Sequence, residues 1–124
     1  MSWHRGLTET ERAFLAAPPP LALARLATVT STGSPHVVPV GWTFDQAREV
    51  FVLGGRDVLR TARARHVRAN GRAAITIDGV DTSLGWHPWA LLVSGRAELE
   101  ESAGSIVLHP DEVSSWGLPV PPPG

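Results

Sequence analysis

Residues 23–44 read LARLATVTSTGSPHVVPVGWTF and predict a β-hairpin. Residues 23–30 are rich in Leu, Val and Thr, and they lead into a turn cluster of Ser, Thr, Gly and Pro at residues 31–35. From His36 to Phe44 the even-numbered side chains are the larger set and the odd-numbered ones the smaller, as in a strand with two different faces. The hairpin therefore favours an antiparallel β protein.

Further strands are predicted downstream, at residues 50–53, 73–78, 89–100 and 105–109, with a polar connection at 45–49 and a loop at 79–87. Between them the pattern is helical from Asp57, the expected N-cap, to Asn70 and Gly71, the expected stop. Six short strands can close into a small barrel, which removes exposed sheet edges. We therefore expect a mainly β barrel with one inserted helix.

A short helix is predicted before the first strand. Thr8 and Glu11 have the spacing of a capping box, and three prolines at residues 18–20 end the helix. The last residues, 119–124, are rich in Pro and predict a loose tail. We therefore expect one domain over residues 1–118.

The composition excludes several classes of protein. The chain has 124 residues and a net charge of −1, and it lacks Cys, so neither a disulfide framework nor a thiol nucleophile is available. A strongly basic nucleic-acid-binding surface is not expected at this charge. No apolar run approaches the ~18 residues of a membrane span, and the N-terminus has no signal-peptide core. We expect a cytoplasmic protein that binds neither nucleic acid nor membrane, in which Arg, the only basic residue besides His, must bind any anion.

The usual hydrolytic and metal-binding motifs are not found. The five His residues do not have metal-ligand spacing, and no Gly-x-Ser-x-Gly elbow is present. Asp78 and Asp81 lie near a strand end and are interpreted as part of a turn. No catalytic side chain and no metal site are predicted.

Two segments are candidates for ligand binding. Arg60 and Arg63 lie one turn apart after Gly54 and Gly55, with the Thr61 hydroxyl between them; guanidinium forks match phosphate oxygens, and glycine lets a backbone approach a ligand closely. A solvated helix face is the alternative interpretation. Residues 39–42, Pro-Val-Gly-Trp, form either a flat contact surface or an irregular barrel corner. The loop at 85–89, with two Trp residues, is either a pocket wall or a cover over the core.

Four motifs occur in order along the chain: an opening hairpin (Leu26–Val29 and Gly33–Val40), a segment rich in Gly and Arg (Gly54–Asp57 and Arg60–Arg68), the strand Val93–Glu98, and an ending (Pro110–Val113 and Ser115–Gly117). Together they resemble the pyridoxamine-phosphate-oxidase-like split-barrel flavoproteins, over roughly residues 10–118, and the second motif resembles the phosphate-binding segment of that family. The last motif resembles the ending of a mostly actinobacterial branch that depends on the deazaflavin coenzyme F-420.

The resemblance implies a six-stranded antiparallel split β-barrel, the FMN-binding split barrel, with an inserted helix and a short N-terminal helix. It implies a homodimer with a flavin or deazaflavin in a groove at the subunit interface. By this resemblance the ring system lies against Pro39, Val40 and Gly41. The phosphate is then surrounded by Gly54, Gly55, Arg60, Thr61, Arg63 and Arg65.

The function implied is that of an oxidoreductase in which coenzyme F-420 delivers hydride to an unsaturated or conjugated small-molecule substrate, with FMN as the alternative cofactor. Because such a cofactor carries the chemistry, the lack of an evident catalytic side chain is expected. A proton donor is not assigned; His36, His66, the substrate and water all remain candidates. Two alternatives stay open: a barrel that binds a cofactor without turnover, and a barrel recruited to a non-redox step of a biosynthetic pathway.

Overall fold

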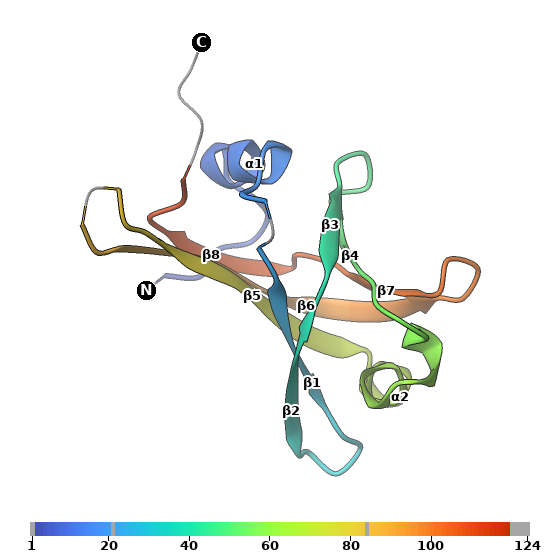
Figure 1. The fold of residues 1–124 in the computed structure, drawn as a ribbon. Helices are drawn as coiled ribbons and strands as arrows, with labels where there is room; N and C mark the ends of the chain where they lie inside the picture. Colours follow the sequence, from blue (N-terminus) through green and yellow to red (C-terminus); the bar gives the residue numbers. More distant parts are fainter. Residues whose placement is uncertain (1, 21, 84, 120–124) are drawn as a thin grey trace.

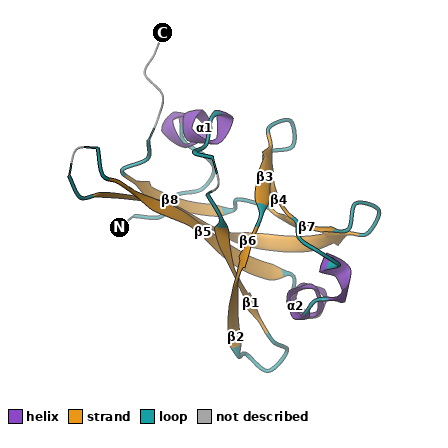
Figure 2. Cartoon of the chain, in the orientation of Figure 1, coloured by secondary structure: helices purple, strands orange, loops and turns teal. Residues whose placement is uncertain are grey.

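The computed structural model describes residues 2–20, 22–83 and 85–119, so the predicted tail lies outside the described residues except for Pro119. Strands dominate the chain, and two helices lie at opposite ends of the sheet (Figures 1 and 2). In chain order the elements are α1 (Glu9–Ala16), β1 (Ala24–Val29), β2 (Pro35–Val40), β3 (Trp42–Asp45), β4 (Val50–Leu53), the short 3-10 helix η1 (Val58–Arg60), α2 (Ala62–Asn70), β5 (Arg72–Asp81), β6 (His87–Glu100), β7 (Ser105–Leu108) and β8 (Glu112–Trp116).

All strand pairs are antiparallel, and the sheet runs in the order β2-β1-β5-β6-β7-β4-β3, with β8 also paired to β6. The long strand β6 belongs to two half-sheets, because residues 87–96 pair with β5 and residues 97–100 pair with β7. The two ends of this order, β2 and β3, follow one another in the chain with only Gly41 between them. The split-barrel prediction is confirmed by this arrangement.

Three strand predictions need correction. The strand predicted over residues 36–44 is divided at Gly41, because β2 pairs with β1 while β3 pairs with β4 in the other half-sheet. The loop predicted at 79–87 is shorter, since β5 extends to Asp81 and β6 begins at His87. Strand β8 was missed because its two serines are polar, although the Ser114 hydroxyl is satisfied internally by the carbonyl of Ser2 at 2.8 Å.

The inserted helix begins later than predicted. Asp57 does not cap a helix: it has a left-handed backbone with φ of 49°, and its side chain makes no capping hydrogen bond. The chain is extended again at Thr61, whose hydroxyl accepts the Ala64 amide and so caps α2. The predicted stop is confirmed, because Gly71 has φ of 67° and donates its N–H to Val67. Neither helix in the described ranges has the length and apolarity needed to cross a membrane.

The short helix predicted from the capping box is confirmed as α1, and it covers one end of the core. The Thr8 hydroxyl accepts the Glu11 amide at 3.1 Å, and the Glu11 carboxylate accepts the Thr8 amide at 2.9 Å. Phe14 of the helix is fully buried, with its ring 5.4 Å from that of Trp89 on β6. The strands contribute the rest of the core, including Leu26, Phe51, Leu53, Ile75, Ile77, Leu91, Val93, Ile106, Leu108 and Val113.

Candidate functional site

The first candidate segment is the junction between β2 and β3. Val40 is anchored in the core, whereas its neighbours Pro39 and Gly41 are exposed. Pro39 is compatible with this position because β2 is the last strand of its half-sheet, where a missing N–H is tolerated. A methyl group built on Gly41 would meet nothing within 4 Å, so the backbone is open to a ligand here. At this junction two exposed residues, Pro39 and Gly41, flank the buried Val40.

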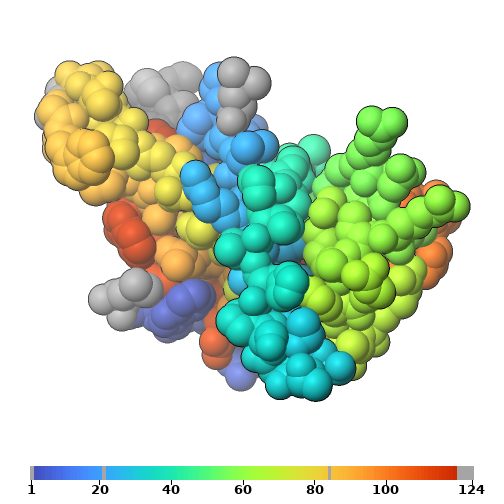
Figure 3. Space-filling view, turned by 60° about the horizontal axis from the view of Figure 1, so that its bottom comes forward, coloured from blue at the N-terminus to red at the C-terminus, as the bar shows by residue number. Residues whose placement is uncertain are grey.

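The second candidate segment lies directly beside the first. The Gly54 amide donates to the Gly41 carbonyl at 3.2 Å, which joins the end of β4 to the β2–β3 junction. In Figure 3 the chain of β2 and β3 (teal) and the chain from β4 to α2 (green) lie next to one another on the same face. The structure therefore brings together the two segments that the sequence singled out separately.

Arg63 is held beneath this second segment. Its side chain is half-buried, and its Nε atom is buried without a hydrogen-bond partner among the described residues. Gly55 has φ of 142°, a conformation that favours glycine, and a methyl group built on it would lie 2.7 Å from Nη2 of Arg63, so a larger residue would displace the guanidinium. A buried N–H without an acceptor costs free energy. An anion bound in this cradle would relieve that cost, so the residues present fit a phosphate-bearing group.

Arg60, Thr61 and Arg63 do not lie together on one helix, as the sequence analysis expected. The Thr61 hydroxyl donates to the Val58 carbonyl at 2.5 Å and accepts the Ala64 amide, so its donor is already used by the local fold. Arg60 belongs to η1 rather than α2 and lines, with Gly55, a cavity of about 300 Å³. The predicted one-turn spacing of Arg60 and Arg63 on one helix is wrong because the chain is extended at Thr61.

Arg65 is not brought to the cradle with Arg63. Two residues along an α-helix are separated by about 200° of rotation. Arg65 is accordingly exposed, while Arg63 lies on the same side of α2 as the buried Val67. Of the residues predicted to contact phosphate, Gly54, Gly55 and Arg63 converge, Arg60 lies at a neighbouring cavity, and Arg65 points elsewhere.

A pair of histidines links α2 to β1 and β2, a contact that the sequence spacing did not reveal. His66 is nearly buried, its Nδ1 lies 2.8 Å from the Thr28 hydroxyl, and its ring packs edge-on against His36 with ring centres 4.7 Å apart. Burial, together with the nearby His36 and Arg65, lowers the pKa of His66 below its ordinary value. The surroundings of His66 therefore favour its neutral form. His36 is exposed and lies on β2, four residues before Val40.

A pocket of about 390 Å³, lined mainly by apolar residues, lies between the end of α1 and β3. Trp42 lines it and follows Gly41 directly, and the Trp42 indole is fixed by a 2.9 Å hydrogen bond to the Ala22 carbonyl. Phe44, also in the lining, packs against Phe51 with ring centres 5.0 Å apart. Two aromatic side chains with fixed positions therefore line the pocket, and one of them, Trp42, directly follows the exposed Gly41 in the chain.

Known proteins resemble the chain in both sequence and fold. The family model described as pyridoxamine 5'-phosphate oxidase matches residues 7–112. A 5a,11a-dehydrotetracycline/5a,11a-dehydrooxytetracycline reductase from Streptomyces rimosus subsp. rimosus is 32% identical over 104 residues, covering 76% of this chain and 73% of the relative.

Two solved structures share the fold at low sequence identity. A conserved hypothetical protein from Mycobacterium tuberculosis superposes with a TM-score of 0.67 and 16% identity, covering 97% of this chain and 94% of its own. A protein described as an F-420 reductase gives a TM-score of 0.57 at 18% identity, with coverage of 89% and 96%. With the family match over most of its length, the chain belongs to the pyridoxamine 5'-phosphate oxidase family.

Proposed function

We propose that the protein is a reductase that uses coenzyme F-420 to reduce a conjugated small molecule. The observation that carries the proposal is the junction of the two candidate segments, where Gly54 is hydrogen-bonded to Gly41 and Arg63 lies under Gly55. The relative from Streptomyces rimosus supports the reaction class, because it is described as a reductase of dehydrotetracyclines. The structural likeness to an F-420 reductase is in keeping with the cofactor.

In this proposal each segment has a separate task. The exposed backbone at Pro39 and Gly41 supports the ring system, and the buried Val40 side chain anchors this segment to the core. Arg63 binds phosphate by charge-assisted hydrogen bonds, which are strong where water is excluded. Gly55 lies against the guanidinium with Gly54 beside it, and Arg60 adds a second positive charge from the neighbouring cavity.

When bound, reduced F-420 supplies a hydride; the protein supplies position and shielding from water. The chain's own residues bind and orient, and no side chain of the site is needed as a nucleophile. The aromatic pocket at Trp42 and Phe44 is the proposed seat for the apolar part of the substrate, because it begins at the residue after Gly41. FMN is the alternative cofactor for the same cradle, because Arg63 would bind its phosphate in the same way.

We also propose that the chain forms a homodimer with the cofactor groove at the subunit interface. The outer surface of β2 supports this: the strand ends its half-sheet, and Val37 on it is 67% exposed. Light scattering after gel filtration measures the mass directly. A dimer that Val37→Asp converts into monomer is the expected result, and a monomeric wild type would contradict the proposal.

The cofactor is tested by titrating the purified protein with F-420 and with FMN while following fluorescence quenching. Saturable F-420 binding with weaker FMN binding supports the proposal, and the reverse order assigns FMN instead. Turnover is then measured as oxidation of reduced F-420 in the presence of enones, quinones and polycyclic ketones. Binding without any turnover would leave a cofactor-binding protein, and binding of neither molecule would refute the cofactor proposal altogether.

A further inference from the structure

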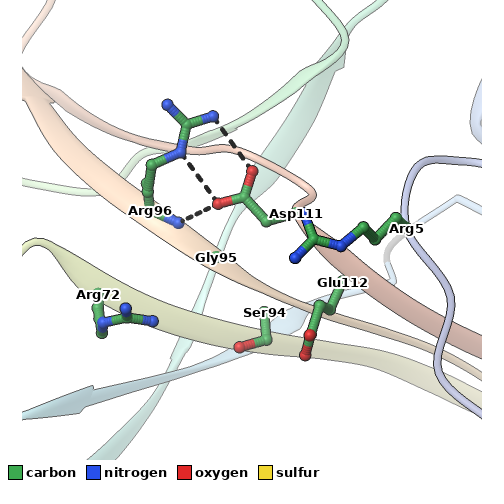
Figure 4. A pocket seen from close by; sticks show the side chains of 7 residues that line it. All are labelled: Arg5, Arg72, Ser94, Gly95, Arg96, Asp111 and Glu112. Atoms are coloured by element: carbon green, nitrogen blue, oxygen red, sulfur yellow. Dashed lines mark hydrogen bonds and ion pairs between the residues drawn. The ribbon is translucent and has the colours of Figure 1, made fainter.

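A second polar cavity, of about 560 Å³, lies on a different part of the sheet (Figure 4). Arg72 pairs with Arg96 across β5 and β6, and Ser94 pairs with Glu112 across β6 and β8. Directly opposed residues of an antiparallel pair lie on the same face of the sheet, as do residues two apart on one strand. Arg72, Ser94, Arg96 and Glu112 therefore all project from one face, outside the core.

The N-terminal segment adds a third arginine to this face. His4 and Val113 exchange backbone hydrogen bonds at 2.9 and 2.8 Å, which places Arg5 beside Glu112. The position of His4 is fixed further by the contact of its Nε2 atom with the buried Glu11 carboxylate at 2.9 Å. The contacts of His4 with Val113 and Glu11 therefore fix the backbone next to Arg5, which lines the cavity.

Arg96 is held rigidly by the segment that follows β7. The Asp111 carboxylate accepts from Nε and Nη2 of Arg96 at 3.0 and 3.1 Å, and from the Arg96 backbone amide at 3.0 Å. The close approach requires glycine at position 95, because a methyl group there would lie 2.0 Å from the His109 carbonyl oxygen. Asp111 uses two of the five guanidinium N–H groups, so three remain to bind a ligand.

Positive charge in this cavity exceeds what its carboxylates neutralise. Among the described residues, neither Arg5 nor Arg72 has an ion-pair partner, and Arg72 lies directly opposite Arg96. Like charges directly opposed across strands destabilise a sheet. Asp111 is already committed to Arg96, which leaves Glu112 as the other carboxylate in the lining. The lining carries three arginines and two carboxylates, a net charge of +1, which favours an anionic ligand.

We propose that this cavity binds the phosphate group of a small phosphate monoester, separately from the cofactor cradle. Arg72 and the free N–H groups of Arg96 face the phosphate, in the fork geometry that suits its oxygens. Ser94 and Glu112 lie beside them and accept hydrogen bonds from hydroxyl groups of the rest of the ligand. The site shares no residue with the proposed cofactor groove, so this proposal can be tested independently of the proposed reductase activity.

The test is a titration of the isotope-labelled protein with inorganic phosphate and with glycerol phosphate at constant ionic strength, followed by NMR. The expected result is saturable shifts of the Arg5 and Arg72 Nε–H signals and of the amides of residues 94–96 and 112. Arg72→Gln weakens binding by at least about tenfold, because it removes a charge-assisted contact. Arg48→Gln removes the same charge from an exposed arginine between β3 and β4, outside both sites, and changes binding by less than about twofold.

Arg5→Gln is a second variant that leaves the sheet untouched, and it is expected to weaken binding in the same direction. Shifts confined to residues 54–65 would place phosphate in the cofactor cradle and overturn the proposal. Equal shifts with succinate, or shifts that never saturate, would also overturn it, because they indicate general attraction to positive charge rather than a phosphate site.

Discussion

Glu11 is the buried residue whose removal is expected to harm the fold most directly. Its side chain is fully buried at the joint between α1, the N-terminal segment and β8. One carboxylate oxygen accepts from the Thr8 amide and contacts His4 Nε2, both at 2.9 Å, and the other accepts from the Ser115 hydroxyl at 2.6 Å. Glu11→Ala leaves these groups without their acceptor.

The size of the effect follows from these contacts. Removing one partner from a buried charged network costs about 3–5 kcal/mol, because the remaining groups stay desolvated. Glu11→Gln keeps one acceptor oxygen and is expected to cost about 1–3 kcal/mol. A domain of this size has a stability of about 5–15 kcal/mol, so the alanine variant loses a large share of it. The corresponding fall in melting temperature is roughly 10 °C or more.

Thermal and urea unfolding followed by circular dichroism measure this loss. The matched control is Glu9→Ala, which removes an exposed carboxylate from the same helical turn and is expected to cost less than about 1 kcal/mol. If Glu11→Ala melts within about 2 °C of the control, the proposed role of the buried network is refuted.

The same residue makes a pH prediction. Burial acts to raise the pKa of Glu11, but hydrogen bonds from Ser115, Thr8 and His4 together outweigh it and hold the pKa below its ordinary value of 4.5. The folded state therefore favours the charged carboxylate. Its contribution to stability is complete above pH 4.5 and is lost as the pH falls through the folded-state pKa. Glu11→Gln is expected to lose that part of the acid sensitivity.

The remaining predictions concern backbone packing and the histidine pair. Gly95→Ala is expected to destabilise the protein by about 3 kcal/mol or more, because the added methyl group meets the backbone carbonyl of His109. Gly41→Ala is the control, because a methyl group there has no atom within 4 Å. Equal urea midpoints for the two variants would contradict the expected clash at Gly95. His66 has a lowered pKa, so its neutral form is favoured by the fold: stability is complete above the ordinary value of 6.5 and falls as the pH drops below it. His66→Gln, measured by urea unfolding between pH 7 and pH 5, is expected to show a shallower pH dependence than wild type, and an unchanged slope would exclude His66 as its source.

Local signals in the sequence predicted the elements that depend on local chemistry. Helix α1 follows from the capping pair Thr8 and Glu11, and the end of α2 follows from Gly71. The beginning of α2 was predicted at Asp57, but the backbone is left-handed at Asp57 and extended at Thr61, so Thr61 is the cap. Propensity alone does not distinguish such neighbours.

Features that depend on distant pairing were not predictable from spacing. Strand β8 is a strand because it pairs with the middle of β6, and its two serines are satisfied by residues about one hundred positions away. The phosphate cavity likewise combines Arg5, Arg72 and Arg96 from three separate segments. Residue chemistry identified the two candidate segments, and the family resemblance implied a cofactor for them. Their contact through Gly54 and Gly41 was visible only in the fold.

The affinity of the Arg63→Gln variant for F-420 shows directly whether the cradle under Gly55 holds the cofactor phosphate. Arg63 is predicted to make a charge-assisted contact, so its loss raises the dissociation constant at least about tenfold. Arg68→Gln, on the exposed side of the same helix, changes it by less than about twofold. Equal dissociation constants for the two variants and wild type would contradict the assignment of this cradle.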